Sequence, residues 1–242
     1  MKLPIYFISD LHLNLNGKNY DLKKRNSLSN FFNHILQNGG TLFIVGDLFD
    51  YWFEYKYFIP KNYFDILTKI SQLKSKGIEI NFIPGNHDFW INDFAYEELF
   101  SNIYPDGAKI YIENKKFLIL HGDGILKNDF RYRILKNIIR NKLFIFLFKL
   151  IHPDISYELA KFLSQKKHKN IKNDSIKKLK SELAIFAKKN LNNNIDFVLL
   201  GHYHLKDEIN LESGKLILLG DWMKWKTYAF FDGKNMALKE WK

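Results

Sequence analysis

The chain of 242 residues contains no cysteine. This absence excludes a disulfide framework and a thiolate metal site, so a bound metal would need histidine, aspartate or asparagine ligands. Long apolar runs are also missing, because no stretch approaches the roughly 18 consecutive apolar residues of a membrane-spanning helix. The first apolar run, residues 5–8, is too short for the core of a signal peptide. We therefore expect a protein that stays in the cytoplasm.

Apolar residues are plentiful but come in short runs. Hydrophobic residues make up 46% of the chain and aromatic residues 17%, which suffices for one large domain, or for one domain with an insertion. Five runs have the length and composition of buried strands: residues 3–9, 41–45, 78–84, 116–120 and 196–200. Because ligands of open α/β sheets bind at the carboxyl ends of strands, the residues that follow these runs are candidates for a site.

Each of the five runs ends in a polar cluster, and these clusters hold five of the eight histidines of the chain. A single cluster could be an ordinary strand-end turn, or a histidine bonded within the core. Five in succession favour a metal site. The clusters are Asp10-Leu11-His12, Gly46-Asp47-Leu48-Phe49-Asp50, Gly85-Asn86-His87-Asp88, His121-Gly122-Asp123 and Gly201-His202-Tyr203-His204.

The residue types suit two neighbouring divalent ions. Such a pair needs a shared anionic ligand, and a carboxylate such as Asp47 can contact both ions. Residues two apart in an extended segment point the same way, so Asp10 and His12 can face one ion, and His202 and His204 repeat the spacing. Two such ions activate water and neutralise charge on a phosphoryl group. This chemistry predicts hydrolysis of a phosphoester or a phosphoanhydride.

The clusters resemble, in order, the signature of the calcineurin-like metallophosphoesterases: Asp-x-His, Gly-Asp-x-x-Asp/Glu, Gly-Asn-His-Asp/Glu, a lone histidine and Gly-His-x-His. The resemblance covers residues 10–204. It implies an α/β fold in which a β-sandwich is flanked by helices, α/β/β/α. It also implies two sets of ligands, Asp10, His12, Asp47 and His204 for one ion and Asp47, Asn86, His121 and His202 for the other.

The same resemblance implies roles around the ions. His87, with Asn86, acts at the substrate phosphoryl group, where His87 is a proton donor or stabilises charge. Asp50 and Asp88 orient the loops. Mn²⁺ is the ion that we expect in such a nitrogen and oxygen site, ahead of Fe, Zn, Co and Mg.

An insertion separates the last two clusters. His121 and His202 are 81 residues apart, whereas the earlier steps from cluster to cluster are 35 to 39 residues. We expect a phosphoesterase core at 1–123 and 195–242, and an inserted helical lid at 124–194. The lid has seventeen lysines and arginines and five acidic residues, a net charge of +12, against +11 for the whole chain. Its most apolar stretch is 143–151.

Three interpretations of the insertion are open: a structural subdomain with a solvated basic surface, a nucleic-acid patch, or a cap over an acylated phosphate substrate. A nucleic-acid surface would interleave aromatic with basic residues, but here the aromatics lie apart from the basic run 166–180. We therefore expect no nucleic-acid partner, and no obligate protein partner is evident. An apolar pocket with a basic rim suits acyl chains, phosphates and an anionic lipid surface.

This combination resembles one branch of the family, the UDP-2,3-diacylglucosamine pyrophosphatases of lipid A synthesis. Shared features are Trp52 behind Gly-Asp-Leu-Phe-Asp, and Leu-Leu-Gly-Asp-Trp at 218–222. The branch hydrolyses the pyrophosphate to UMP and 2,3-diacylglucosamine 1-phosphate, which implies an acylated nucleotide-sugar substrate and peripheral binding to the cytoplasmic face of the inner membrane. The implied substrate contacts are Asn86, His87, Asp129, Tyr132, Ser164, His168, Lys172 and His202.

Two departures keep other functions open. His87 stands where well-known members of the branch have arginine, and their Ser-x-x-x-Asn-x-x-Lys pattern would place asparagine at His168 and lysine at Ile171. One alternative is a phosphoesterase acting on a nucleotide, nucleic acid or phosphoprotein. Another is a scaffold that has lost its metals, against which the complete ligand set argues.

Overall fold

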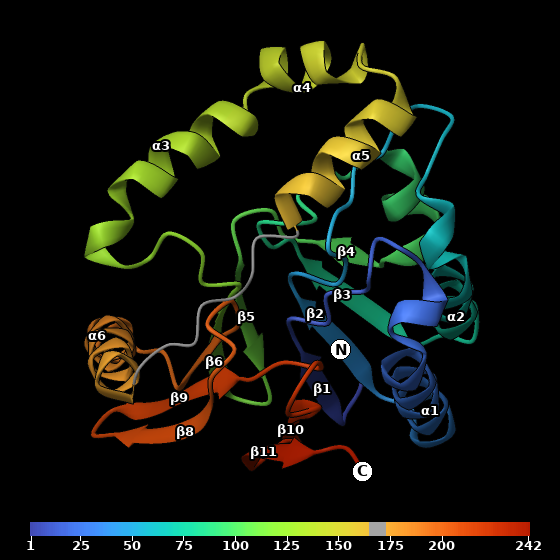
Figure 1. The fold of residues 1–242 in the computed structure, drawn as a ribbon. Helices are drawn as coiled ribbons and strands as arrows, with labels where there is room; N and C mark the ends of the chain where they lie inside the picture. Colours follow the sequence, from blue (N-terminus) through green and yellow to red (C-terminus); the bar gives the residue numbers. More distant parts are fainter. Residues whose placement is uncertain (165–172) are drawn as a thin grey trace.

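The computed structural model describes residues 1–164 and 173–242, and two β-sheets lie face to face at its centre (Figure 1). The six-stranded sheet has the order β11-β10-β1-β2-β3-β4, and the five-stranded sheet the order β5-β6-β7-β9-β8. The strands of the first are β1 (Ile5–Ile8), β2 (Thr41–Val45), β3 (Glu79–Ile83), β4 (Asn102–Ile103), β10 (Thr227–Phe231) and β11 (Met236–Glu240). Those of the second are β5 (Ala108–Ile112), β6 (Lys115–Leu120), β7 (Phe197–Leu200), β8 (Lys206–Leu211) and β9 (Gly214–Leu219).

The central strands β1 and β2 are almost entirely apolar because both of their faces are buried. In β1, Ile5 and Phe7 pack into the core between the two sheets, where they meet residues of the second sheet such as Phe117. Tyr6 and Ile8 point the other way, into the core beneath the helices. This arrangement explains why the sequence shows uninterrupted apolar runs in place of strict alternation.

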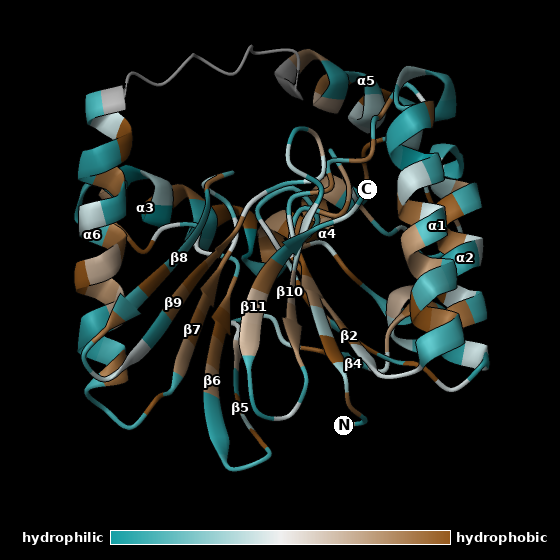
Figure 2. Ribbon diagram, turned by 90° about the horizontal axis from the view of Figure 1, so that it is seen from below, coloured by the Kyte–Doolittle hydropathy of each residue, from teal (hydrophilic) through white to brown (hydrophobic). Residues whose placement is uncertain are grey.

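Helices cover both outer faces (Figure 2). The six-stranded sheet is covered by α1 (Leu22–Asn38) and α2 (Phe64–Ser75), and the five-stranded sheet by α6 (Asn173–Leu191). Leu183 and Ala187 of α6 are fully buried against Val198 and Leu216. The predicted α/β/β/α fold is confirmed. Helix α6 lies within the segment 124–194 yet serves as a layer of the sandwich, and the division into core and lid stays a prediction.

Three further helices arch over the ends of the strands (Figure 1). They are α3 (Phe130–Ile139), α4 (Lys142–Lys149) and α5 (Pro153–Ser164). Every residue of α3 and α4 is described, and none is buried. Helix α5 begins at Pro153, because the fixed φ of proline suits the first turn of a helix.

Short helical turns complete the chain: η1 (Lys18–Tyr20), η2 (Lys61–Tyr63), η3 (Ala95–Leu99) and η4 (Lys127–Asp129). Among the helices of residues 1–164 and 173–242, none combines the length and the apolar character needed to cross a bilayer.

Candidate metal centre

The five polar clusters meet at one edge of the sandwich. Strands β1, β2 and β3 are parallel neighbours in one sheet, and β6 and β7 are parallel neighbours in the other. The carboxyl ends of parallel strands lie at the same edge of a sheet, so the loops that follow them are brought together.

Asp47 lies between two groups of side chains. Its Oδ2 atom is 3.6 Å from Nε2 of His12 and 3.3 Å from Nε2 of His121. On one side, Asp10 Oδ1 is 3.9 Å from His12 Nε2 and 3.7 Å from His204 Nε2. Asp47 therefore occupies the position that a carboxylate shared by two ions requires.

The side chains form sets of the size that a divalent ion needs. In each of three sets, one ligand atom per residue lies within 4.8 Å of the others. Asn86 joins the second set, since its Oδ1 atom is 3.3 Å from His121 Nε2. All seven residues predicted as ligands therefore come together. The sets are Asp10, His12 and His204; Asp47, His121 and His202; and His12, Asp47 and His87.

The backbone at these residues is strained. The φ angles of Asp10, His12, Asp47, His202 and His204 lie between 44° and 67°, in the left-handed region that side chains rarely adopt. Such strain persists where surrounding structure enforces it, and it is concentrated at functional sites. We expected an extended segment to bring Asp10 and His12 to one ion. That reason is wrong: β1 ends at Ile8, and left-handed turns aim the two side chains.

At two glycines of the motifs there is no room for a side chain. A Cβ atom at Gly85 would collide with the carboxylate of Asp47, and one at Gly201 would collide with Ser9. Neither glycine has a positive φ, so the close approach of neighbouring atoms, rather than conformational freedom, requires glycine at these two positions.

Acceptors behind the histidines fix their orientation. His12 Nδ1 is 3.4 Å from Oδ1 of Asp50, His204 Nδ1 is 3.5 Å from Oδ2 of Asp221, and His121 Nδ1 is 3.0 Å from the backbone oxygen of Val45. An acceptor at Nδ1 holds a proton there and leaves Nε2 to bind a metal.

Asp221 was missed as a site residue by the sequence analysis. Its signal was Gly220-Asp221 at the end of β9, which repeats Gly46-Asp47 at the end of β2.

Asp88 joins the loops after β2 and β3. Its carboxylate accepts hydrogen bonds from the backbone N–H groups of Leu48 at 2.7 Å, Gly85 at 2.8 Å and Asp47 at 3.3 Å. Burial and the nearby charge of Asp47 raise the pKa of Asp88 to about 6. This is the loop-orienting role expected of Asp88.

The residues fit divalent cations. Asp10 Oδ1 and His12 Nε2 are buried and have no hydrogen-bond partner among the described residues, which is costly unless a ligand satisfies them. Burial by itself would lower the pKa of His121, but the carboxylate of Asp47 raises it to about 10. In return, His121 keeps the pKa of Asp47 well below its usual range, against the effect of burial. Without metal, the protonated imidazole of His121 therefore offsets the negative charge of the carboxylates around it.

The predicted substrate contacts are placed in part. The Tyr132 hydroxyl donates to Asp123 Oδ2 at 2.6 Å, and Asp129 Oδ2 accepts from the backbone N–H of Leu126 at 3.3 Å. Ser164 is the last residue of α5, and its side chain is not described. His168 and Lys172 lie outside the described residues.

Comparison with known proteins decides the family. Residues 3–206 match the model of the calcineurin-like phosphoesterases. The chain belongs to this family. Membership confirms the predicted hydrolase class and implies divalent metal ions, for which the acidic and imidazole sets described above are the candidates.

Relatives match along nearly the whole chain. A UDP-2,3-diacylglucosamine hydrolase of Porphyromonas gingivalis is 30% identical, with 99% of this chain and 98% of that protein covered. A protein of the same name from Neisseria meningitidis is 28% identical, with 90% of each chain covered. Among solved structures, one described as an archaeal phosphodiesterase superimposes with a TM-score of 0.48 at 17% identity, covering 98% of this chain and 99% of that one.

Proposed function

We propose that this phosphoesterase hydrolyses the pyrophosphate of UDP-2,3-diacylglucosamine to UMP and 2,3-diacylglucosamine 1-phosphate. The observation that carries the proposal is the match to hydrolases of that substrate, because it spans the helices over the site as well as the ligand motifs. An insertion that differs between families would break such an alignment. In this proposal residues 124–194 form the lid, and α6 packs on the five-stranded sheet.

Asp10, His12, Asp47, Asn86, His121, His202 and His204 would hold two divalent ions, for which we propose Mn²⁺ because the donors are nitrogen and oxygen. Bound there, the ions supply an activated water and neutralise charge on the phosphoryl group. Asn86 and His87 would contact that group. His87 lies at the centre, its ring 4.9 Å from that of His12, and its Nδ1 atom is 2.7 Å from the backbone oxygen of Asp50. This contact fixes the ring of His87 and directs Nε2 away from Asp50.

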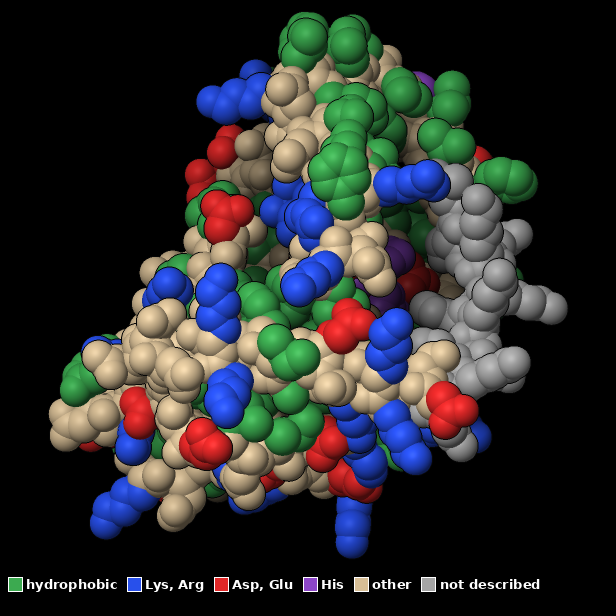
Figure 3. Space-filling view, turned by 90° about the vertical axis from the view of Figure 1, so that its left-hand side faces the viewer, with side chains coloured by type: hydrophobic (Ala, Val, Ile, Leu, Met, Phe, Trp, Pro, Cys, Tyr) green, Lys and Arg blue, Asp and Glu red, His purple; other side chains and the backbone are tan. Residues whose placement is uncertain are grey.

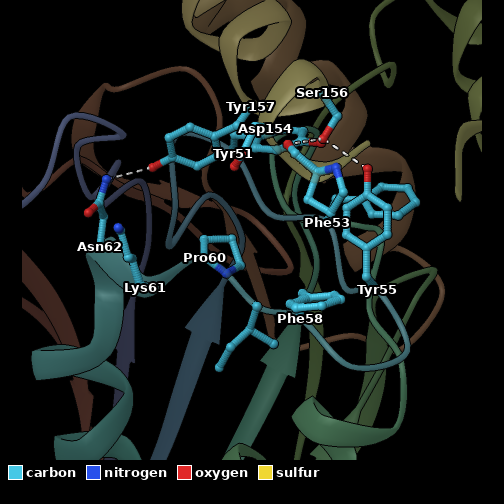
Figure 4. A pocket seen from close by; sticks show the side chains of 12 residues that line it. Tyr51, Phe53, Tyr55, Phe58, Pro60, Lys61, Asn62, Asp154, Ser156 and Tyr157 are labelled. Atoms are coloured by element: carbon cyan, nitrogen blue, oxygen red, sulfur yellow. Dashed lines mark hydrogen bonds between the residues drawn. The ribbon is translucent and has the colours of Figure 1, made fainter. Parts of the chain in front are cut away.

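The surroundings of the site suit an acylated substrate. A cavity of about 380 Å³ lies between the loop at residues 51–62 and the first turns of α5 (Figure 4). Phe53, Tyr55, Phe58 and Tyr157 line it and make it largely apolar. Tyr51, which follows Asp50 in the chain, also lines it. A hydrocarbon chain fits such a space better than a nucleic acid or a phosphoprotein segment does.

The arch also favours a peripheral position on the inner membrane. Hydrophobic side chains cover α4 at the top of Figure 3, lysines and arginines lie below them, and histidines are visible in a hollow beneath. Leu143, Phe146 and Leu150 are 59–70% exposed. Insertion of these side chains among lipid tails, with the basic residues at anionic headgroups, would hold the site at the cytoplasmic surface, where the acylated substrate resides.

The test measures UMP released from UDP-2,3-diacylglucosamine by the Mn²⁺-loaded protein, with UDP-N-acetylglucosamine as the substrate without long acyl chains. We expect release from the acylated substrate alone, and none from the Asp47→Ala variant. Equal release from both nucleotide sugars would favour a phosphoesterase for nucleotides. No release from either would remove the proposal.

A further inference from the structure

A tryptophan and two lysines stand at the rim of the metal centre, outside the roles described so far. Trp225 is half-buried in the turn between β9 and β10, and its indole N–H donates to the backbone oxygen of His204 at 3.3 Å. The Nζ atoms of Lys206 and Lys224 lie 4.2 and 4.0 Å from the centre of its ring, and Lys206 also pairs with Glu240. An aromatic surface with two ammonium groups therefore adjoins a residue proposed to bind metal.

The turn is tied to the centre by Asp221. Oδ1 of Asp221 accepts hydrogen bonds from the backbone N–H groups of Lys224 at 2.6 Å and Trp225 at 3.4 Å. The other oxygen of the same carboxylate lies 3.5 Å from the ring of His204. One side chain thus contacts the histidine ring and the backbone of the tryptophan, and the hydrogen bond of the indole N–H to His204 holds the ring against the same loop.

We propose that Trp225, Lys206 and Lys224 bind the nucleotide half of the substrate, with the base on the indole ring and a lysine on the phosphate. Bases of every kind stack on aromatic side chains, and ammonium groups pair with phosphate oxygens. A base that stacks on Trp225 displaces an ammonium group from the ring, and that group is then available to the phosphate. The inference deepens the proposed function, on which it rests for identifying the nucleotide as a uridine nucleotide.

Among residues 1–164 and 173–242, the polar contacts of α3 lie at other loops than the contact of Trp225. Helix α3 is tied to the loops after β6 and β3, where Lys136 pairs with Asp123 at 2.7 Å and Arg140 donates to the backbone oxygen of Gly85 at 3.5 Å. Trp225 instead adjoins His204, at the end of the segment after β7. The acyl chains and the nucleotide of one substrate would then lie on separate surfaces, with the pyrophosphate between them at the centre.

The test is direct binding of UMP and of ribose 5-phosphate to the Mn²⁺-loaded protein, by calorimetry. The two ligands share the sugar and the phosphate and differ in the base. We expect UMP to bind about 10-fold more tightly, and we expect Trp225→Leu to abolish that difference. Trp225→Phe keeps an aromatic ring and should preserve most of it. Lys239→Gln is the matched control, because Lys239 lies 3.9 Å from the ring centre of Phe230, a residue of β10 outside the site.

The outcomes separate the possibilities. Equal affinity of the wild-type protein for the two ligands would overturn the inference. So would an equal loss of both in Trp225→Leu, which would show that the tryptophan serves only to support His204. A base-dependent difference that is lost in Trp225→Leu supports the inference even if no UMP is released from UDP-2,3-diacylglucosamine, in which case the proposed function alone fails.

Discussion

Replacing Asp88 by alanine tests whether a buried carboxylate that touches no predicted metal-binding atom sets the geometry of the centre. The change removes two short charge-assisted hydrogen bonds, from Leu48 and Gly85, and two longer ones, from Asp47 and Phe49. It leaves four buried N–H groups to find other partners. At about 1–3 kcal/mol for each of the two short bonds, we expect the free energy of unfolding to fall by about 2–6 kcal/mol. For a chain of this size, the melting temperature would then fall by roughly 4–24 °C.

The effect on metal binding should be distinct from the effect on stability. The loops that carry Asp47 and Asn86 lose their common acceptor, so we expect the affinity for Mn²⁺ to fall about 10- to 100-fold at temperatures where the variant remains folded. Thermal unfolding by circular dichroism and calorimetric titration with Mn²⁺ measure the two effects. Asp93→Asn is the control, since Asp93 is exposed, in the helical turn just before η3. If Asp88→Ala bound Mn²⁺ as tightly as the control, the assignment of Asp88 as the residue that joins the loops would be refuted.

Three other predictions follow from the site and the arch. Asp47→Ala should reduce the metal content measured by mass spectrometry from two ions to none, because the Asp47 carboxylate lies between both ligand sets; a variant that keeps both ions contradicts the shared ligand. With a pKa of about 10, His121 is protonated at pH 7 in the metal-free protein, so Mn²⁺ binding should release about one proton and should tighten about 10-fold per pH unit as the pH rises toward 10. Calorimetry in buffers of different ionisation enthalpy measures the proton release, and an Mn²⁺ affinity that does not change with pH refutes the prediction. The double variant Phe146→Ser, Leu150→Ser should bind anionic vesicles about 10-fold or more weakly in a sedimentation assay, with an unchanged melting temperature because both side chains are exposed. Unchanged binding to the vesicles would count against α4 as the membrane contact.

The buried strands that carry the site were predictable from local sequence, and three of the edge strands were not. Strands β1, β2, β3 and β7 lie within the predicted apolar runs, and β6 begins one residue before its run, because burial on both faces leaves an apolar signal. The edge strands β4, β5 and β8 were not predicted. β4 is two residues long, and all six residues of β8 are partly or fully exposed, so neither has the composition of a buried strand.

The sequence by itself determined the inventory of the site: which carboxylates, amides and imidazoles follow which strands, and in what order. Those are local properties, since a strand end and its polar residues are neighbours in the chain. Tertiary structure decided how they meet. Left-handed turns aim Asp10 and His12, and Asp221 reaches His204 from another strand. Such contacts join residues far apart in the chain, and their geometry depends on how the two sheets and the loops pack, which no local pattern encodes.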